Sequence, residues 1–261
     1  MPSRFAAPSG GVWPVSSLSA MKNISGNRAL ALVLAKAPAP GKVKTRLMPK
    51  LSAANAAAVH RACLADVLCT VASLPHRIEK CVLFAGSPSV VRQLKVGPLP
   101  KNISIGSQSR GDLGRKLVIA LQGFFRSGVK RIVVLGTDTP WLSRGRILYA
   151  LRLLSRTEVV LGPTRDGGYY LIACRRLIPE MFSGIAWGTS RVMAQTKIRL
   201  RTLGVPCHLL PVDFDLDRPE DLEKCRRRLA LSRARGKRPA PALFKTLRLI
   251  RQEQSPPSRP R

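Results

Sequence analysis

The stretch VVLGTDTP (Val133–Pro140) places a carboxylate directly after an apolar run. The branched apolar residues predict a buried strand over 131–135, which ends abruptly before Asp138. Asp138 is one of only 14 Asp and Glu residues in a chain that has 45 Lys and Arg. A buried carboxylate without a partner costs several kcal/mol, so Asp138 needs a hydrogen-bond donor or a cation. The stretch therefore predicts a core strand that leads into a polar site.

On both sides of this stretch, strand-like apolar runs alternate with helical patterns. Ala29–Leu34 predicts another buried strand, and Ser52 can cap an Ala-rich helix that runs to about Leu74. The other expected elements are strands at 81–84, 103–107, 158–162, 169–173 and 207–212, and helices at 88–94, 112–125, 145–154, 190–203 and 219–231. This alternation predicts an α/β fold: a single domain whose mostly parallel, mixed sheet has helices on both faces.

The length and composition fit one globular domain with poorly ordered ends. We expect a folded domain over 28–231, a disordered leader over 1–27, and a basic, Pro-rich disordered tail over 232–261. Translation could start at Met1 or at Met21. No apolar run is long enough to span a membrane, and the leader lacks the apolar core of a secretory signal. We therefore expect a cytoplasmic protein, with an organellar transit peptide as the weaker alternative.

The cysteines and histidines argue against two common kinds of site. None of the six cysteines forms a C-x-x-C pair, which disfavours zinc and redox motifs and suggests reduced thiols. The three histidines lie far from any nucleophile motif, which disfavours catalysis by a Ser/His/Asp or Cys/His set.

The formal net charge of +31 leaves two interpretations open. The densest basic run is Lys224–Arg261, which is also Pro-rich and poor in aromatic residues. We favour a solvated helix end with a disordered basic extension. Nucleic-acid binding through the basic tail is the alternative and is not favoured.

The loop at 35–47 follows the first strand and carries four cations around a glycine. Such a loop suits a di- or triphosphate, with the plain alternative of an exposed basic loop. It is not a P-loop, because Lys42 is followed by Val43 and a lysine stands where the first glycine should be. Its candidate phosphate-binding residues are Lys36, Gly41, Lys42, Lys44, Thr45 and Arg46.

Asp138 has two alternative roles. It could cap the turn that follows it, or it could bind a divalent cation, Mg²⁺ or Mn²⁺, through oxygen ligands. A cation there would face the basic loop, and phosphates would be held between them. Asp215 and Asp217 precede the last expected helix at i and i+2, so both face one side of an extended segment and could supply a second ligand.

The loop Leu161–Tyr170 contains Asp166 followed by two glycines. Asp166 could accept hydrogen bonds from sugar hydroxyls or from an acceptor. A plain hairpin turn is an equal alternative, because Asp-Gly is a strong turn signal.

Six motifs in order resemble those of the radical-SAM/selenodomain-associated transferases, also described as arsenosugar-biosynthesis-type glycosyltransferases. That family has the type A glycosyltransferase (nucleotide-diphospho-sugar transferase) fold and is akin to guanylyltransferases that act on phospholactate and molybdenum cofactor. The motifs are AKAPAPGKVKTRL (35–47), GDLGRK (111–116), LGTDTP (135–140), VLGPTRDGGYYLI (160–172), IAWGTSRVMAQT (185–196) and DLDRPEDL (215–222).

The resemblance implies roles for particular residues. Asp138 would be the metal-binding acid, Asp217 or Asp215 would be the second, and Asp138 and Asp166 would be the catalytic acids. The nucleotide would be flanked by Arg110, Asp112 and Arg115. The substrate pocket would be lined by Gly167, Gly168, Tyr169, Trp187, Gly188 and Thr189. Two departures are the Ala-Pro-Ala-Pro-Gly loop in place of a glycine-rich one, and Arg218 where relatives often carry Thr.

These observations predict a metal-dependent transferase that uses a nucleotide-activated donor. Transfer of a sugar from a nucleoside diphosphate sugar to a small acceptor is favoured. The alternative is nucleotidyl transfer from a nucleoside triphosphate with release of pyrophosphate. A further alternative is a basic nucleic-acid-binding protein on a degenerate transferase scaffold.

Overall fold

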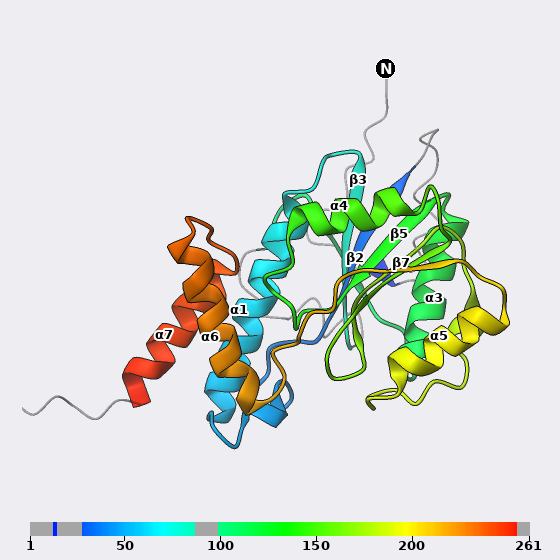
Figure 1. Ribbon diagram of the computed structural model, residues 1–261. Coiled ribbons are helices and arrows are strands. Elements are labelled where there is room, and N and C mark those ends of the chain that lie inside the picture. The colour runs from blue at the N-terminus through cyan, green and yellow to red at the C-terminus, as the bar shows by residue number, and fades with distance from the viewer. Residues whose placement is uncertain (1–12, 15–27, 87–98, 255–261) are drawn as a thin grey trace, which may run out of the picture.

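The computed structural model describes residues 13–14, 28–86 and 99–254. Within these residues an eight-stranded sheet runs in the order β1-β4-β3-β2-β5-β7-β6-β8 (Figure 1). The strands are β1 (Trp13–Pro14), β2 (Ala29–Ala35), β3 (Ile78–Phe84), β4 (Ser104–Ser107), β5 (Arg131–Leu135), β6 (Val159–Pro163), β7 (Tyr169–Cys174) and β8 (Cys207–Leu209).

The sheet is mostly parallel, with one reversed strand. β2 lies between β3 and β5 and pairs with both in parallel, while β7 is antiparallel to both β5 and β6. Central parallel strands are apolar on both faces, and β5 shows this in the buried run from Ile132 to Leu135. The predicted mixed α/β sheet is confirmed.

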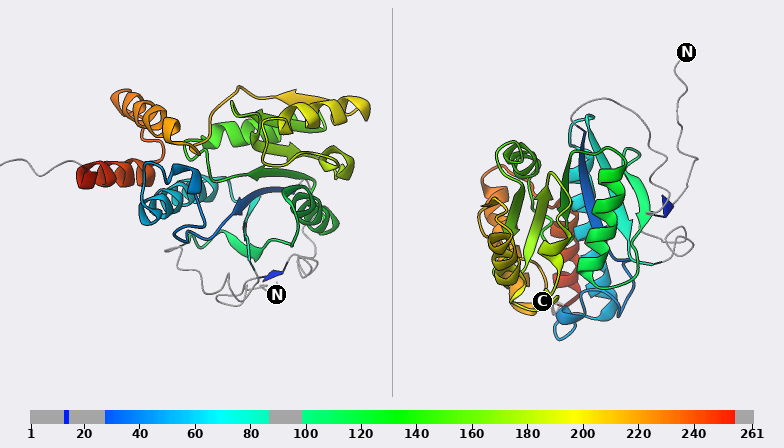
Figure 2. Two further views of the ribbon diagram at one scale, coloured as in Figure 1. Left: turned by 90° about the horizontal axis from the view of Figure 1, so that it is seen from below. Right: turned by 90° about the vertical axis from the view of Figure 1, so that its right-hand side faces the viewer.

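Helices cover both faces of the sheet (Figures 1 and 2). The helical elements are η2 (Thr45–Leu47), α1 (Ala53–Ala72), α3 (Leu113–Arg126), α4 (Arg144–Leu153), η3 (Pro179–Phe182), α5 (Val192–Thr202), α6 (Pro219–Ala234) and α7 (Pro241–Gln254). One core cluster joins α1 and α4 to the sheet, and a second joins α3, η3 and α5 to it. The expected caps form: Ser52 Oγ accepts from Asn55 N (3.1 Å), and Asp112 Oδ1 accepts from Arg115 N (2.8 Å).

The C-terminal region differs from the prediction. α6 continues to Ala234, and α7 packs beside α1 with Leu243, Leu247 and Ile250 in a third apolar cluster. These three residues recur at i, i+4 and i+7, which is one face of a helix. The prediction of a disordered tail over 232–261 is therefore wrong for 232–254, and the folded region extends beyond the expected limit at 231. Residues 255–261 lie outside the described chain.

Two other predictions fall largely on residues that the structure does not describe. Of the expected leader over 1–27, only Trp13–Pro14 is described, as a short strand that pairs in parallel with β4. The helix expected at 88–94 lies outside the described residues. Two strands differ from the prediction by three residues, since β3 begins at Ile78 rather than at 81 and β8 ends at Leu209 rather than at 212. Every helix in the described part of the chain is too short or too polar to cross a bilayer.

Candidate functional site

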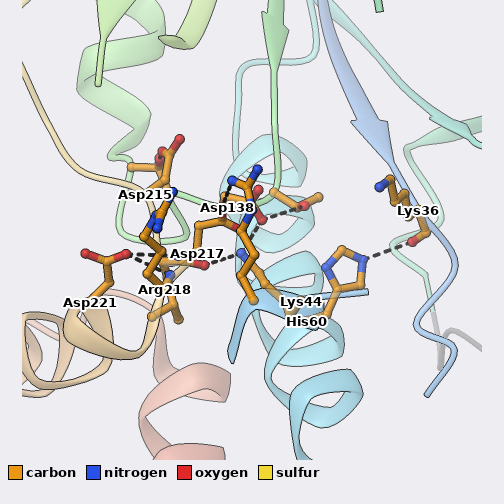
Figure 3. A network of polar contacts seen from close by, with 12 residues as sticks. Lys36, Lys44, His60, Asp138, Asp215, Asp217, Arg218 and Asp221 are labelled. Carbon is orange, nitrogen blue, oxygen red and sulfur yellow. Dashed lines mark hydrogen bonds and ion pairs between the residues drawn. The ribbon is translucent and has the colours of Figure 1, made fainter. Parts of the chain in front are cut away.

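Lys44 and Asp138 form an ion pair where β2 and β5 end (Figure 3). The Lys44 ammonium also donates to the carbonyl oxygen of Leu216, which belongs to the segment before α6. Its side chain is only 2% exposed, whereas the side chain of Asp138 is 43% exposed. Lys44 reaches this position from a left-handed backbone conformation, with φ 50°. One buried cation thus connects three segments that are far apart in the sequence.

The ion pair fixes the charge of both partners. Burial is the largest effect and would raise the pKa of Asp138, but the charge of Lys44, its hydrogen bond to Asp138 and nearby positive charge together hold that pKa below its usual value. Burial would likewise lower the pKa of Lys44, but Asp138 reverses this and the pKa is raised. Asp138 is therefore a carboxylate at neutral pH, and its side chain is partly exposed.

Asp215 lies near Asp138 and behaves differently. Its Oδ1 accepts a hydrogen bond from Thr139 Oγ1 (2.6 Å), one residue after Asp138. Burial, together with the charges of Asp138 and Asp166, raises the pKa of Asp215 to about 7. Three acids therefore converge on one region that Lys44 only partly neutralises.

Asp217 is held by a different cation. Arg46 Nη1 lies 2.8 Å from Asp217 Oδ2, so the predicted phosphate-binding arginine pairs with a predicted metal ligand. The backbone N–H of Asp217 donates to Asp221 Oδ2 (3.3 Å), as does that of Arg218 (2.9 Å). Asp221 thus satisfies two donors at the start of α6, a role that Arg218 cannot fill because a guanidinium accepts no hydrogen bond.

The other predicted phosphate-binding residues of the first loop lie at the surface. Lys36, Lys42 and Thr45 are exposed, and Gly41 adopts φ 73°, which allows the loop to turn. The carbonyl oxygen of Lys36 accepts from His60 Nε2 (3.1 Å), and His60 is buried in α1. Burial lowers the pKa of His60, so it is neutral at physiological pH.

The Asp-Gly-Gly turn packs on the segment that leads into α5. Asp166 Oδ1 accepts from Thr164 Oγ1 (2.5 Å) and from Gly168 N (3.1 Å), so it closes the turn as well as facing the acids. A Cβ at Gly167 would lie 1.9 Å from the carbonyl oxygen of Ser190, and φ there is +86°. Only glycine fits, which brings the turn against residues 188–193.

The predicted substrate and nucleotide residues form a second group. Trp187 contacts Tyr169 edge-on with ring centroids 6.3 Å apart, and its Nε1 would lie 2.7 Å from a Cβ at Gly114 in α3. Thr189 Oγ1 donates to the carbonyl oxygen of Ala186 (2.7 Å). Asp112 is occupied as the cap of α3, and Arg110 and Arg115 are exposed. Among the described residues, no hydrogen bond or ion pair links these three to Asp138.

A pocket of about 410 Å³ joins the acids to the start of α6. It is lined by Arg165, Asp166, Phe214, Asp215, Asp217, Arg218, Glu220, Asp221 and Lys224. The structure thus brings Asp166 together with Asp215 and Asp217, which the sequence placed in another motif. Sequence reasoning missed Thr139 and His60 as neighbours of the site, although both lie in segments that it had singled out.

A protein can hold a divalent cation in two modes: with a full set of its own ligands, or with one or two carboxylates that share the cation with substrate and water. The acids of this site fit the second mode. Within the described residues, no group of three or more His, Cys, Asp or Glu could hold a metal ion unaided. Mg²⁺ is commonly bound by one or two carboxylates together with substrate phosphates and water. Asp138 and Asp215 suit that second mode, and the raised pKa of Asp215 marks a place where negative charge is undercompensated.

Comparison with known proteins agrees with this geometry. The family model "Uncharacterized protein conserved in bacteria (DUF2064)" matches residues 57–189, about half of the chain. The chain belongs to the DUF2064 family. The DUF2064 match includes Asp138, Asp166 and Trp187, whereas Lys44 and Asp215 lie outside it.

Solved structures resemble the chain over most of its length. A "putative nucleotide-diphospho-sugar transferase" from Desulfovibrio desulfuricans G20 is 30% identical, with a TM-score of 0.75, and the match covers 86% of this chain and 97% of that one. A cytidylyltransferase from Leptospira borgpetersenii is 15% identical with a TM-score of 0.51, and the match covers 89% of this chain and 100% of that one. No curated protein matches the chain.

These comparisons confirm the expected fold and the expected class of enzyme, a transferase. At 15% identity the cytidylyltransferase shows the fold alone.

Proposed function

We propose that this protein is a metal-dependent glycosyltransferase that moves a sugar from a nucleoside diphosphate sugar to a small acceptor. The observation that carries the proposal is the convergence of Asp138, Asp215 and Asp166 opposite the basic loop, at the carboxyl ends of the strands. Ligands of open α/β sheets bind at that edge. The 30% identity to a protein named as a nucleotide-diphospho-sugar transferase supports a sugar nucleotide as donor.

In this proposal Asp138 and Asp215 hold Mg²⁺ or Mn²⁺, with Asp217 nearby but paired to Arg46. When bound, the cation would stabilise the negative charge of the departing diphosphate. Lys44 keeps Asp138 ionised and fixes its position, as the ion pair requires. The exposed side chains of Lys36 and Lys42 are free to contact phosphate oxygens.

The second group of residues would bind the remainder of the substrates. Arg110 and Arg115 would flank the nucleotide at the start of α3, with Asp112 acting through the cap that orders them. Tyr169, Trp187 and Thr189 would line the sugar or acceptor pocket beside Gly167 and Gly168. Asp166 faces both this region and the acids, which suits a residue that orients or deprotonates an acceptor hydroxyl.

Nucleotidyl transfer is the second candidate function. The shared fold of a cytidylyltransferase favours it, because such an enzyme would use the same cation and basic loop. An acceptor phosphate would attack the α-phosphorus of a nucleoside triphosphate and release pyrophosphate. The sequence motifs that resemble radical-SAM-associated glycosyltransferases favour the first candidate instead.

A cytoplasmic location is part of the proposal. All six cysteines are free, and four of them are buried. Paired cysteines are typical of oxidising compartments, so unpaired thiols support a reducing one.

The proposal is tested by incubating the protein with Mg²⁺ or Mn²⁺ and a panel of sugar nucleotides and nucleoside triphosphates. Release of nucleoside diphosphate identifies glycosyl transfer, and release of pyrophosphate identifies nucleotidyl transfer. We expect Asp138→Asn to lower turnover about 100-fold or more, because the cation would lose a ligand.

Because Asp138→Asn leaves the buried Lys44 without its partner, circular dichroism must show that the variant is folded. Asp215→Asn provides a second variant that leaves the ion pair intact. Glu180→Gln is the matched control, since it removes an exposed carboxylate from η3. Folded Asp138→Asn and Asp215→Asn proteins with wild-type turnover would refute the metal site.

A further inference from the structure

A second pocket, of about 500 Å³, lies beside the acids and is strongly basic. Five of its ten lining residues are cationic and one is acidic: Arg165, Lys224, Arg227, Arg228 and Arg235 against Asp213. It shares Arg165, Phe214 and Lys224 with the pocket that contains Asp215 and Asp217. Its volume falls within the range of small-molecule sites.

One face of α6 supplies most of this pocket. Lys224, Arg227, Arg228, Leu231 and Arg235 recur at i, i+3, i+4, i+7 and i+11, so their side chains share one side of the helix. The opposite wall is the turn at Arg165 and the segment 212–214. A backbone hydrogen bond from Arg165 N to the carbonyl oxygen of Asp213 (3.0 Å) joins the two parts of that wall.

Two of the five cations are already neutralised. Arg228 binds both carboxylate oxygens of the buried Asp213, and Lys224 Nζ lies 3.1 Å from Asp221 Oδ1. Among the described residues, Arg165, Arg227 and Arg235 have no acidic partner within ion-pair distance, and all three are exposed. Three guanidinium groups are therefore left to bind a ligand, and guanidinium matches the geometry of phosphate oxygens.

The pocket also presents apolar surface. Val212 is 60% exposed and Leu231 is 61% exposed, and both line the pocket between the cations. Large exposed apolar side chains within a concave site are typical of contacts with an organic ligand. A merely solvated basic helix face would need neither the concavity nor these two residues.

We propose that this pocket binds the acceptor of the transfer reaction, and that the acceptor is an organic phosphate monoester with an apolar part. Arg165, Arg227 and Arg235 bind the phosphate dianion, and Val212 and Leu231 contact the apolar part. The acceptor hydroxyl that receives the transferred group then extends past Phe214 toward Asp166 and Asp215. The acceptor role rests on the proposed transferase function, whereas the binding site itself does not.

The test measures binding of phenyl phosphate and of inorganic phosphate by calorimetry, at physiological ionic strength, without nucleotide or divalent cation. We expect wild type to bind phenyl phosphate more tightly than inorganic phosphate. The double variant Arg227→Gln/Arg235→Gln should bind phenyl phosphate about 100-fold more weakly, since each charged contact contributes about tenfold. Glutamine favours helices, so α6 is retained.

Arg156→Gln is the matched control. It removes an exposed arginine that precedes β6, at the opposite end of the strand from Arg165, and should leave binding unchanged. Equal binding by wild type and the double variant, or no binding by wild type, would overturn the site. If inorganic phosphate bound as tightly as phenyl phosphate, Val212 and Leu231 would not contact an apolar part of the ligand, and that role would be overturned.

Single-stranded RNA serves as the competing ligand. If an RNA oligonucleotide displaces phenyl phosphate, and if its binding also depends on Arg227 and Arg235, the pocket is a surface for polyanions rather than an acceptor site. That outcome would overturn the proposal. Because no nucleotide or metal is present, failure at Asp138 would leave this assay unaffected. Conversely, failure to bind phenyl phosphate would overturn the pocket alone, because the metal-dependent release of nucleoside diphosphate is measured in a separate assay.

Discussion

Asp215 shows how a single residue of the site can oppose the stability of the fold. Its carboxyl group is partly buried and lies near the charges of Asp138 and Asp166, so its pKa in the folded protein is about 7 rather than 3.8. Between those two values the folded protein holds a proton that the unfolded chain has released. By linkage, the contribution of Asp215 to the free energy of unfolding falls as the pH rises through this window.

Asp215→Asn should therefore stabilise the protein, and increasingly so as the pH rises from about 4 to the folded pKa of about 7. Asparagine keeps the acceptor for Thr139 but never becomes charged. Urea unfolding of the variant and wild type across this range, without added metal, measures the difference. If the two proteins differed in free energy of unfolding by the same amount at every pH, or if Asp215→Asn were less stable than wild type above the folded pKa, the raised pKa of Asp215 would not be the cause.

At the same scale, sequence patterns predicted residues whose role is local and missed those whose role depends on long-range contacts. Ser52 and Asp112 cap helices as expected, because the cap and its donor are three residues apart. Lys44 was expected to bind phosphate, yet its ammonium contacts Asp138, which is 94 residues away. The left-handed backbone conformation of Lys44 directs that side chain inward. A lysine in the sequence does not predict this conformation.

The element that the sequence analysis missed, α7, lacks a cap of its own. Ala240 precedes it with φ 47°, and its first turn contains no acidic residue. Asp66 in α1 supplies the cap instead, since its two carboxylate oxygens accept from Ala242 N (3.0 Å) and Leu243 N (2.8 Å). A helix that is capped and covered by another helix is stable only in the folded protein, so local signals understate it. Its apolar spacing at 243, 247 and 250 was the available signal.

Asp66→Ala should lower the free energy of unfolding by about 1–2 kcal/mol, the usual loss when a helix cap is removed. Two backbone N–H groups would be left in a partly buried position without an acceptor. Asp66→Asn keeps one acceptor oxygen and should lose less. Urea unfolding below the folded pKa of Asp66, about 6, compares the three proteins without the full cost of burying a charged carboxylate. If Asp66→Ala were as stable as wild type, α7 would not depend on this cap.

At the scale of the whole molecule, several of the few acids are paired with cations, and most of the 45 Lys and Arg exceed what 14 acids can pair. Asp213 accepts hydrogen bonds from three side chains at once, those of Arg146, Arg228 and Trp141. Asp138, Asp217 and Asp221 are likewise paired. Nine of the 45 Lys and Arg lie in 232–261, so the positive charge is spread along the chain rather than gathered at its end. Removing residues 232–261 to test nucleic-acid binding would also remove α7 and expose its apolar cluster, so point variants are the sound test.

So large a net charge has a consequence that is independent of any site. Like charges repel across the folded surface, and this repulsion is weaker in the expanded chain, so it destabilises the compact state. Sodium chloride screens charges beyond a Debye length of about 10 Å at about 0.1 M. We expect the melting temperature to rise between about 0.05 M and about 0.5 M salt, by about 2–4 °C for each kcal/mol of repulsion removed. Potassium chloride at equal ionic strength should give the same rise, because screening does not distinguish the two salts. A melting temperature that fell with either salt would mean that short-range ion pairs such as Lys44–Asp138 outweigh the long-range repulsion.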